Sequence, residues 1–279
     1  NLATIALGSG ITAVSVAAGA SHTCALLNDG TVKCWGEGGS GQLGQGNTND
    51  LGDGASEMGG NIAAIGLGTN KTAVSIAAGD NHSCALLNDG TVKCWGANGS
   101  GQLGYGNTNN LGDGGSEMGT NLAAIDIGTN KTAVAIAAGA SHTCALLNDG
   151  TVKCWGEGGS GQLGKGNTND LGDGGSEMGT NLAVIDIGTN KTAVAIAAGA
   201  SHTCALLNDG TVKCWGEGGS GQLGKGNTND LGDGGSEMGT NLAVIDIGTN
   251  KTAVSITAGD NHSCAVLNDG TVKCWGANG

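Results

Sequence analysis

The sequence predicts an all-β protein built from one tandem repeat of 60 residues. Tryptophans recur at this interval along the whole chain, at Trp35, Trp95, Trp155, Trp215 and Trp275. Histidines keep the same interval, at His22, His82, His142, His202 and His262. Short apolar runs alternate with glycine-rich segments, and no window shows the 3.6-residue apolar stripe of a helix. A fixed period of this size is typical of solenoids, propellers and linear arrays.

The composition limits how such a repeat builds its core. The chain has 279 residues, of which 58 are glycine, and it contains no proline, phenylalanine or arginine. Glycine without a three-residue period excludes collagen, and the many short Val, Ile, Leu and Ala runs argue against disorder. We therefore expect a core of small aliphatic side chains with one tryptophan from each repeat.

The charge and the short apolar runs of the chain argue against two classes of partner, nucleic acids and membranes. The net charge is −13 and every cationic side chain is a lysine. Nucleic-acid binding needs clustered basic residues, so this acidic chain is not expected to bind nucleic acid. The apolar runs are only a few residues long, far too short to span a membrane. No signal peptide or transit segment is visible in the sequence.

One repeat contains three predicted strands and a long loop. Residues 132–138 form a β-type run, 142–147 the next strand and 151–155 the third. The segment that follows is rich in Gly, Asn, Asp and Ser, which predicts a loop with a short strand at Gln162-Leu163. An apolar run at 182–187 leads into the next repeat. The unit is therefore predicted to be an antiparallel meander of three or four strands.

The chain is expected to form a single repeat array over residues 1–279. Long Gly/Asn/Asp loops join its core units, which lie approximately at 12–36, 72–96, 132–156, 192–216 and 252–276. The units of a repeat array bury their faces against neighbours, so the array behaves as one body.

The ten cysteines fall into five pairs of equal spacing. These are Cys24 and Cys34, Cys84 and Cys94, Cys144 and Cys154, Cys204 and Cys214, and Cys264 and Cys274. Each pair flanks an Asn-Asp-Gly turn in the string CALLNDGTVKCW or its variant CAVLNDGTVKCW. A three-residue loop with its glycine in the left-handed region places the two cysteines of each pair opposite each other, at a distance that a disulfide accepts. A two-residue loop would instead place Cys24 opposite Trp35.

Two other interpretations of the cysteines stay open at this point. His22, Cys24 and Cys34 could supply three ligands to zinc, although the spacing is not that of a zinc knuckle and no fourth ligand is evident. Buried free thiols are the other alternative. Disulfides are the preferred interpretation, and five of them indicate an oxidising compartment, hence an extracellular or cell-surface protein.

The repeated motif resembles that of a known family. Residues 133–166, AVAIAAGASHTCALLNDGTVKCWGEGGSGQLGKG, resemble the repeat of the regulator of chromosome condensation family, with its Gly-x-x-His, Val-x-x-Trp-Gly and Gly-Gln-Leu-Gly elements. The resemblance extends over all five copies, of which the last stops before Gln-Leu-Gly. Three copies carry Gly38, Gly158 and Gly218 where the family often has Asn, which the other two keep as Asn98 and Asn278.

This resemblance implies a β-propeller with one four-stranded blade per repeat and, in most members, seven blades. Nuclear members exchange guanine nucleotide on a small GTPase and bind chromatin, which the acidic charge and the paired cysteines argue against. The plant ultraviolet-B photoreceptor of this fold uses clustered Trp and Arg, and this chain has no Arg. Among the members of the family, this chain is most similar in character to the bacterial extracellular ones, which bind other proteins. The 60-residue repeat is longer than the family's usual one.

An acidic loop recurs in the first four repeats and is the candidate metal site. Carboxylates that lie close together in a glycine-rich turn suit Ca²⁺, although the spacing is not that of an EF-hand. The alternative is a solvated turn held by its own hydrogen bonds. The candidate ligands are Asp50, Asp53, Glu57, Asp113, Glu117, Asp170, Asp173, Glu177, Asp230, Asp233 and Glu237. No other cofactor is expected to be required.

Asn-x-Ser/Thr sequons mark candidate glycosylation sites. Four recur at one phase of the repeat, at Asn70, Asn130, Asn190 and Asn250. A sequon on a surface loop of an extracellular protein is a plausible acceptor, whereas chance in an Asn- and Thr-rich chain is the alternative.

No arrangement of residues indicates catalysis. The histidine recurs once in every repeat, whereas catalysis needs one asymmetric constellation. We therefore expect the histidines and tryptophans to be structural, and the chain to be no enzyme. The preferred function is an extracellular scaffold that binds other proteins or copies of itself, with a calcium- or glycan-dependent adhesive module as the alternative. A five-bladed ring, a segment of a larger propeller and an extended filament all fit the repeat.

Overall fold

The computed structural model describes residues 4–54 and 56–278, and it is all-β apart from one 3₁₀ turn, η1 (Gly59–Asn61). Its strands form five separate three-stranded antiparallel sheets, which we call blades 1 to 5. Blade 1 contains β1 (Ala13–Ala18), β2 (His22–Leu27) and β3 (Val32–Gly36). The other blades repeat this pattern in chain order: β4 (Ala73–Ala78), β5 (His82–Leu87), β6 (Val92–Gly96), β7 (Ala133–Ala138), β8 (His142–Leu147), β9 (Val152–Gly156), β10 (Ala193–Ala198), β11 (His202–Leu207), β12 (Val212–Gly216), β13 (Ala253–Gly259), β14 (His262–Leu267) and β15 (Val272–Gly276).

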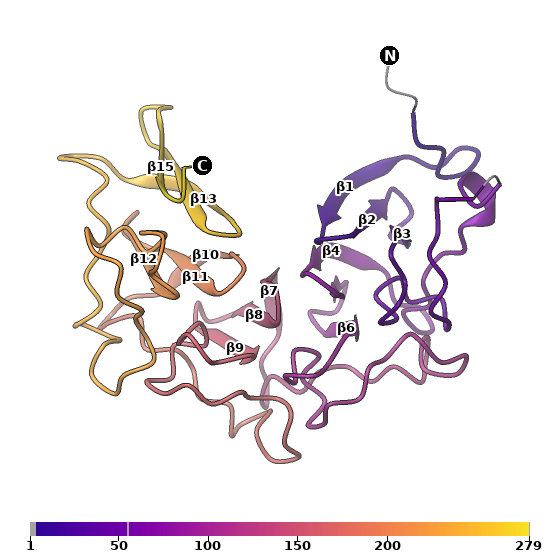
Figure 1. Cartoon of the computed structure of the whole chain (residues 1–279), viewed down its shortest axis with the longest axis horizontal. Helices are drawn as coiled ribbons and strands as arrows, with labels where there is room; N and C mark the ends of the chain where they lie inside the picture. The colour runs from indigo at the N-terminus through magenta and orange to yellow at the C-terminus, as the bar shows by residue number, and fades with distance from the viewer. Residues whose placement is uncertain (1–3, 55, 279) are drawn as a thin grey trace.

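The blades follow one another along an open arc, with blade 1 at one end and blade 5 at the other (Figure 1). The first strand of each blade contacts the first strand of the next blade and lies on the inner side of the arc (Figure 1). Over the residues that the structure describes, the chain does not close into a five-bladed ring.

The hairpin of each blade has the register that the sequence predicts. Cys144 lies opposite Cys154, and Ala145 lies opposite Lys153. The N–H of Gly150 donates to the carbonyl of Leu147, and Gly150 has a φ of 78°, as the left-handed position of a three-residue loop requires. Each cysteine pair is joined by a disulfide, with Cα atoms 4.0 to 4.1 Å apart.

Two expectations about the loop are wrong. Gln162-Leu163 is a turn and not a short strand, because Gly161 and Gly164 on either side adopt left-handed φ values of 79° and 63°. The resemblance implied four strands per blade, whereas each blade has three. A single antiparallel bridge from Gly156 to Leu171 lies where a fourth strand would pair, and the glycine-rich sequence beyond it supports no longer ladder.

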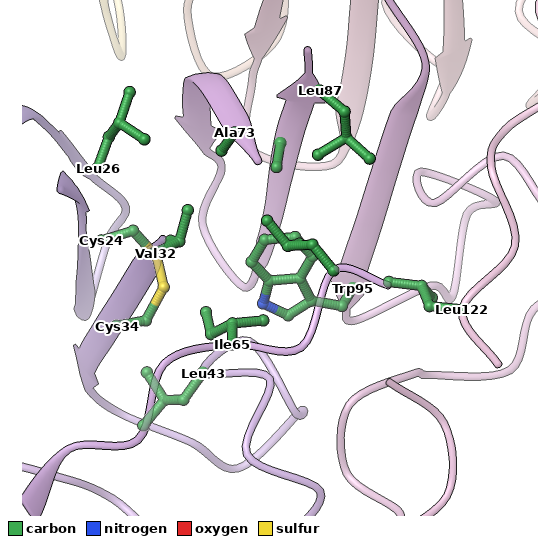
Figure 2. Close-up of a cluster of buried hydrophobic side chains, with 12 residues drawn as sticks. Cys24, Leu26, Val32, Cys34, Leu43, Ile65, Ala73, Leu87, Trp95 and Leu122 are labelled. Carbon is green, nitrogen blue, oxygen red and sulfur yellow. A yellow bond between two sulfur atoms is a disulfide. The ribbon is translucent and has the colours of Figure 1, made fainter. Parts of the chain in front are cut away.

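The core lies between blades and not within a single one. The cluster drawn in Figure 2 joins the Cys24–Cys34 disulfide and Val32 of blade 1 to Trp95 of blade 2. Ile65, from the segment that links the two blades, lies between them, and its N–H donates to the carbonyl of Val32 at 2.8 Å. A three-stranded sheet this small has no core of its own, so each blade depends on the next for its stability.

The first strand of every blade carries a bulge that turns one valine outward. In blade 3, Ala133 pairs with Leu147 and Ala135 with Leu146, so Val134 is an extra residue in the ladder. Its side chain is 55% exposed. The same position is exposed in every blade, at Val14, Val74, Val194 and Val254.

Candidate functional site

The histidine of each of the first four repeats belongs to a hydrogen-bonded connection between blades. His142 Nε2 lies 2.9 Å from Thr203 Oγ1 of the next blade. The Thr203 hydroxyl donates to the carbonyl of Gln162 at 3.0 Å, and Trp215 Nε1–H donates to the same carbonyl at 3.0 Å. Because the hydroxyl proton is committed to Gln162, the imidazole Nε2–H is the donor to Thr203.

The same connection is present at all four blade interfaces. The other three join His22 to Ser83, His82 to Thr143, and His202 to Ser263. Burial lowers the pKa of His82 and of His142 from 6.5 to about 3, because the charged imidazolium would lose its hydration. The four histidines are therefore neutral structural groups, in line with the structural role that the sequence indicates.

A glycine next to each histidine allows the blades to approach closely. A Cβ on Gly139 would lie 2.2 Å from His142 Cε1 and 2.5 Å from the carbonyl oxygen of Gly199 in the next blade. Neither neighbour can move, since one is a buried ring and the other is backbone. The glycine of the Gly-x-x-His motif is thus required by packing between blades.

We expect Gly139→Ala to lower the free energy of unfolding by about 1–3 kcal/mol or more, because overpacking at this position forces the blades apart. Urea unfolding measures this change. Gly159→Ala is the matched control, since a Cβ on Gly159 would have no atom within 4 Å. Equal stability of the two variants would contradict the packing argument.

The turns after the inner strands converge on a cavity at the inner side of the arc. It has a volume of about 540 Å³ and is lined by Ala-Gly-Ala or Ala-Gly-Asp from every blade. Backbone hydrogen bonds join neighbouring turns, for example from Ala140 N–H to the carbonyl of Ala200 at 3.0 Å. Burial raises the pKa of Asp80, and the charge of Asp260 raises it further. The two carboxylates give the opening a negative potential.

Asp80 and Asp260 were not singled out from the sequence, and neither was the hydroxyl partner of each histidine. A signal for the two aspartates exists, because the equivalent position is Ala in the other three repeats. The hydroxyl partners carry no such signal, since they follow the histidine directly in sequence but bind the histidine of the preceding blade.

A buried lysine fixes the long loop to each of the inner blades. Lys153 is 5% exposed, and its Nζ donates to the carbonyls of Ile127 and Gly179 at 2.9 and 2.8 Å. These two carbonyls belong to the segments before and after the blade. Burial lowers the pKa of Lys153. The amine therefore satisfies backbone acceptors where two linkers cross.

The acidic loop uses most of its carboxylates to hold its own backbone. Glu57 Oε2 accepts the N–H groups of Gly52 and Gly54 at 2.8 Å, and these bonds hold the pKa of Glu57 below its ordinary value. Asp50 Oδ1 accepts the N–H of Gly38 at 2.8 Å. Within 4–54 and 56–278, no group of three or more His, Cys, Asp or Glu is arranged to hold a metal ion.

Other copies of the loop bring two carboxylates together. Burial raises the pKa of Asp173, and the adjacent Glu177 raises it further. If this pair takes up Ca²⁺, as the sequence predicts, saturating Ca²⁺ is expected to raise the melting temperature, by an amount corresponding to about 2.7 kcal/mol at 100 times Kd. Differential scanning calorimetry with Ca²⁺, and with Mg²⁺ for comparison, measures the change. No rise with Ca²⁺ would exclude the calcium site, and loss of the rise in Glu177→Gln would locate it.

The candidate sequons lie on exposed turns. Asn70, Asn130, Asn190 and Asn250 adopt left-handed φ values of 58° to 60° at the tip of the Gly-Thr-Asn-Lys turn. The lysine of that turn pairs with the aspartate of a neighbouring hairpin, as Lys131 does with Asp149. A glycan at these asparagines would therefore project from the surface.

Five repeated antiparallel sheets, set as blades along one arc and joined through their faces, define a repeat protein of the β-propeller type. Residues 3–279 match the family model of the RCC1-like domain. The chain belongs to this family. RCC1-like repeat domains are generally non-catalytic and form protein-interaction scaffolds.

Relatives share this repeat at moderate identity. The chain is 32% identical over 267 residues to the ultraviolet-B receptor UVR8 of Arabidopsis thaliana, covering 95% of this chain and 53% of the receptor. It is 30% identical over 258 residues to the human E3 ubiquitin-protein ligase HERC2, covering 92% of this chain and 5% of the ligase. The chain thus spans about half of one relative and a small part of the other.

Solved structures show the same architecture. Yeast RCC1 (Prp20), bound to Kap60 in its crystal structure, is 26% identical with a TM-score of 0.68, covering 95% of this chain and 56% of that one. Human WBSCR16 is 20% identical with a TM-score of 0.72, covering 96% of this chain and 62% of that one, which supports the fold alone. No helix in the described part of the chain is long and apolar enough to cross a membrane.

Proposed function

We propose that this chain is an extracellular scaffold that works by binding proteins. The observation that carries this proposal is that the side chains capable of chemistry, such as histidine and lysine, are used to hold the structure together. The histidine and tryptophan of the inner blades are buried in contacts between blades, as at His142 and Trp155, and the lysine is buried against the linking segments, as at Lys153. The remaining exposed surface consists of repeated loops. Such a surface suits the binding of another protein and not catalysis.

The disulfides support the extracellular part of the proposal. Every blade has one, and the structure shows no free cysteine among its described residues. Each closes a short hairpin, for which we expect a contribution of roughly 2–4 kcal/mol, as in other small loops. Bonds of this kind persist in oxidising compartments. We extend the proposal to the exposed sequons as glycan acceptors and to the acidic loops as calcium sites in the same setting.

Two measurements test the proposal. Intact mass before and after reduction, on protein from an oxidising compartment, is expected to show five disulfides and any attached glycan. Free thiols in that material, with a melting temperature that a reductant does not lower, would overturn the extracellular assignment.

Cross-linking mass spectrometry on the cells that produce the protein tests the scaffold role. We expect cross-links from the partly exposed lysines, such as Lys131 and Lys191, to a second polypeptide. Cross-links confined to single copies of the chain would contradict a binding function. This experiment distinguishes foreign partners from copies of the same chain, because only a foreign partner contributes a peptide that the sequence of this chain does not contain.

A further inference from the structure

A pocket between two successive repeats contains a lysine that differs from the other lysines of the chain. The pocket has a volume of about 430 Å³. Its lining comes from the loop around Lys165, from Val184 and Asp186, and from residues of the segment 234–241 in the following repeat. The volume lies within the usual range of ligand pockets, roughly 300–1,000 Å³.

One backbone carbonyl holds the side chain of Lys165 in place. Lys165 Nζ donates to the carbonyl of Ala183. In the first repeat, Gln45 Nε2 donates to the equivalent carbonyl, that of Ala63, at 3.1 Å. Tyr105 occupies the same position in a similar pocket of about 460 Å³ one repeat before that of Lys165. The pocket and the contact are therefore regular features of the fold, and Lys165 places an amine in them.

The amine of Lys165 has no carboxylate partner. Within the described residues none of the ion pairs involves Lys165, and those present are formed by Lys71, Lys131, Lys191 and Lys251. Lys165 is half-buried, and burial, together with the charge of Lys153, lowers its pKa from 10.5 to about 8. Near neutral pH, a larger share of this amine is therefore in the neutral form that attacks electrophiles than in an ordinary exposed lysine.

We propose that Lys165 is a covalent binding site for small hydroxy-aldehydes, such as open-chain aldoses. The nitrogen of the neutral amine attacks the carbonyl carbon and gives a carbinolamine, which loses water and becomes an imine. Both hydrogens of the amine leave with the aldehyde oxygen as that water, so the step needs no oxidant or reductant. Asp186 lines the same pocket, and its negative charge favours the protonated, positively charged form of the imine.

The lining of the pocket favours a ligand with hydroxyl groups. Ser236 and Thr240 supply hydroxyls, which both donate and accept hydrogen bonds. Asn241 adds a side-chain amide, whose Nδ2 donates to the carbonyl of Ser236 at 2.8 Å. The site goes beyond the scaffold function and does not depend on it.

Reductive trapping tests the proposal. Residues 154–191 and 214–251 are identical in sequence, so Lys165 and Lys225 give the same peptides, and Lys225→Gln serves as the parent protein. The folded parent is incubated near neutral pH with glyceraldehyde and sodium cyanoborohydride, which reduces the imine to a stable secondary amine. Peptide mass spectrometry then measures the labelling of each lysine. We expect Lys165 to be labelled ~10-fold or more faster than Lys191, which is paired with Asp209.

Three controls assign the labelling to the pocket. Propanal, which lacks the hydroxyls, is expected to label Lys165 with a smaller excess over Lys191. In urea the excess is expected to disappear, because the unfolded chain has no pocket. Lys165→Gln in the same parent is expected to keep the melting temperature, since Gln45 makes the equivalent contact, and to lose the fast labelling.

Equal labelling of Lys165 and Lys191 in the folded parent overturns the proposal. An excess that persists in urea overturns it as well, because the local sequence would then be the cause. An equal excess with both aldehydes overturns the choice of hydroxy-aldehydes as the ligand. None of these results affects the scaffold function, which the cross-linking experiment tests separately.

Discussion

Lowering the pH from 7 to 4 is expected to reduce the free energy of unfolding by about 3 kcal/mol for each of His82 and His142. Both histidines are buried and have a pKa of about 3 in the folded chain, against 6.5 when unfolded. Between these two values the unfolded chain binds protons that the folded chain does not. Stability is therefore full above pH 6.5 and falls as the pH decreases toward the folded pKa. Urea unfolding across this pH range measures the slope.

His82→Gln is the control for this expectation. A glutamine amide can still donate to Thr143 Oγ1, which lies 2.9 Å from His82 Nε2, but it does not titrate. The variant is expected to lose about one proton of pH dependence between pH 6.5 and 4. An unchanged slope would show that acid acts through other groups. Asp149 titrates at a pKa of about 2, because Lys131 and Thr151 bond to its carboxylate, so its contribution is lost only in stronger acid.

Trp155→Ala is expected to lower the free energy of unfolding by about 3–5 kcal/mol, the usual cost of removing a large buried aromatic side chain. The ring is fully buried between two blades, and its Nε1–H donates to the carbonyl of Gln102 at 3.0 Å. The substitution leaves both a cavity and an unpaired buried carbonyl. Thermal or urea unfolding followed by circular dichroism measures the loss.

Trp35→Ala tests whether the interface between blades is the cause. Trp35 occupies the same place in the repeat, but no blade precedes it in the described chain, and its ring is only half-buried. We expect this variant to lose clearly less stability than Trp155→Ala. Equal losses would show that tryptophan stabilises its own blade and not the contact with the preceding one.

The parts of the fold that depend on neighbouring residues could be predicted from the sequence. The Asn148-Asp149-Gly150 turn determines the register of its hairpin, and that register places Cys144 opposite Cys154. Residues far apart in sequence were beyond such reasoning. His142 and Thr203 are 61 positions apart, and they meet only because two blades pack at a fixed distance. No local pattern encodes that distance.

The loop was the least predictable region, for a related reason. Gln162 was expected in a strand, but its backbone lies in a turn between two left-handed glycines. Its carbonyl accepts hydrogen bonds from Thr203 and Trp215 of the next blade. Glycine permits many conformations, so a glycine-rich sequence does not specify which one tertiary contacts select. The candidate calcium ligands lie in the same region, where Asp50 and Glu57 accept hydrogen bonds from backbone amides.

The placement of the disulfides determines which parts of the chain can separate during unfolding. All five bonds lie within single blades, so adjacent blades are held by non-covalent contacts and by the linking chain alone. Cooperativity then passes only from nearest neighbour to nearest neighbour. Adjacent blades can therefore separate while every disulfide stays intact, and each detached hairpin keeps its register.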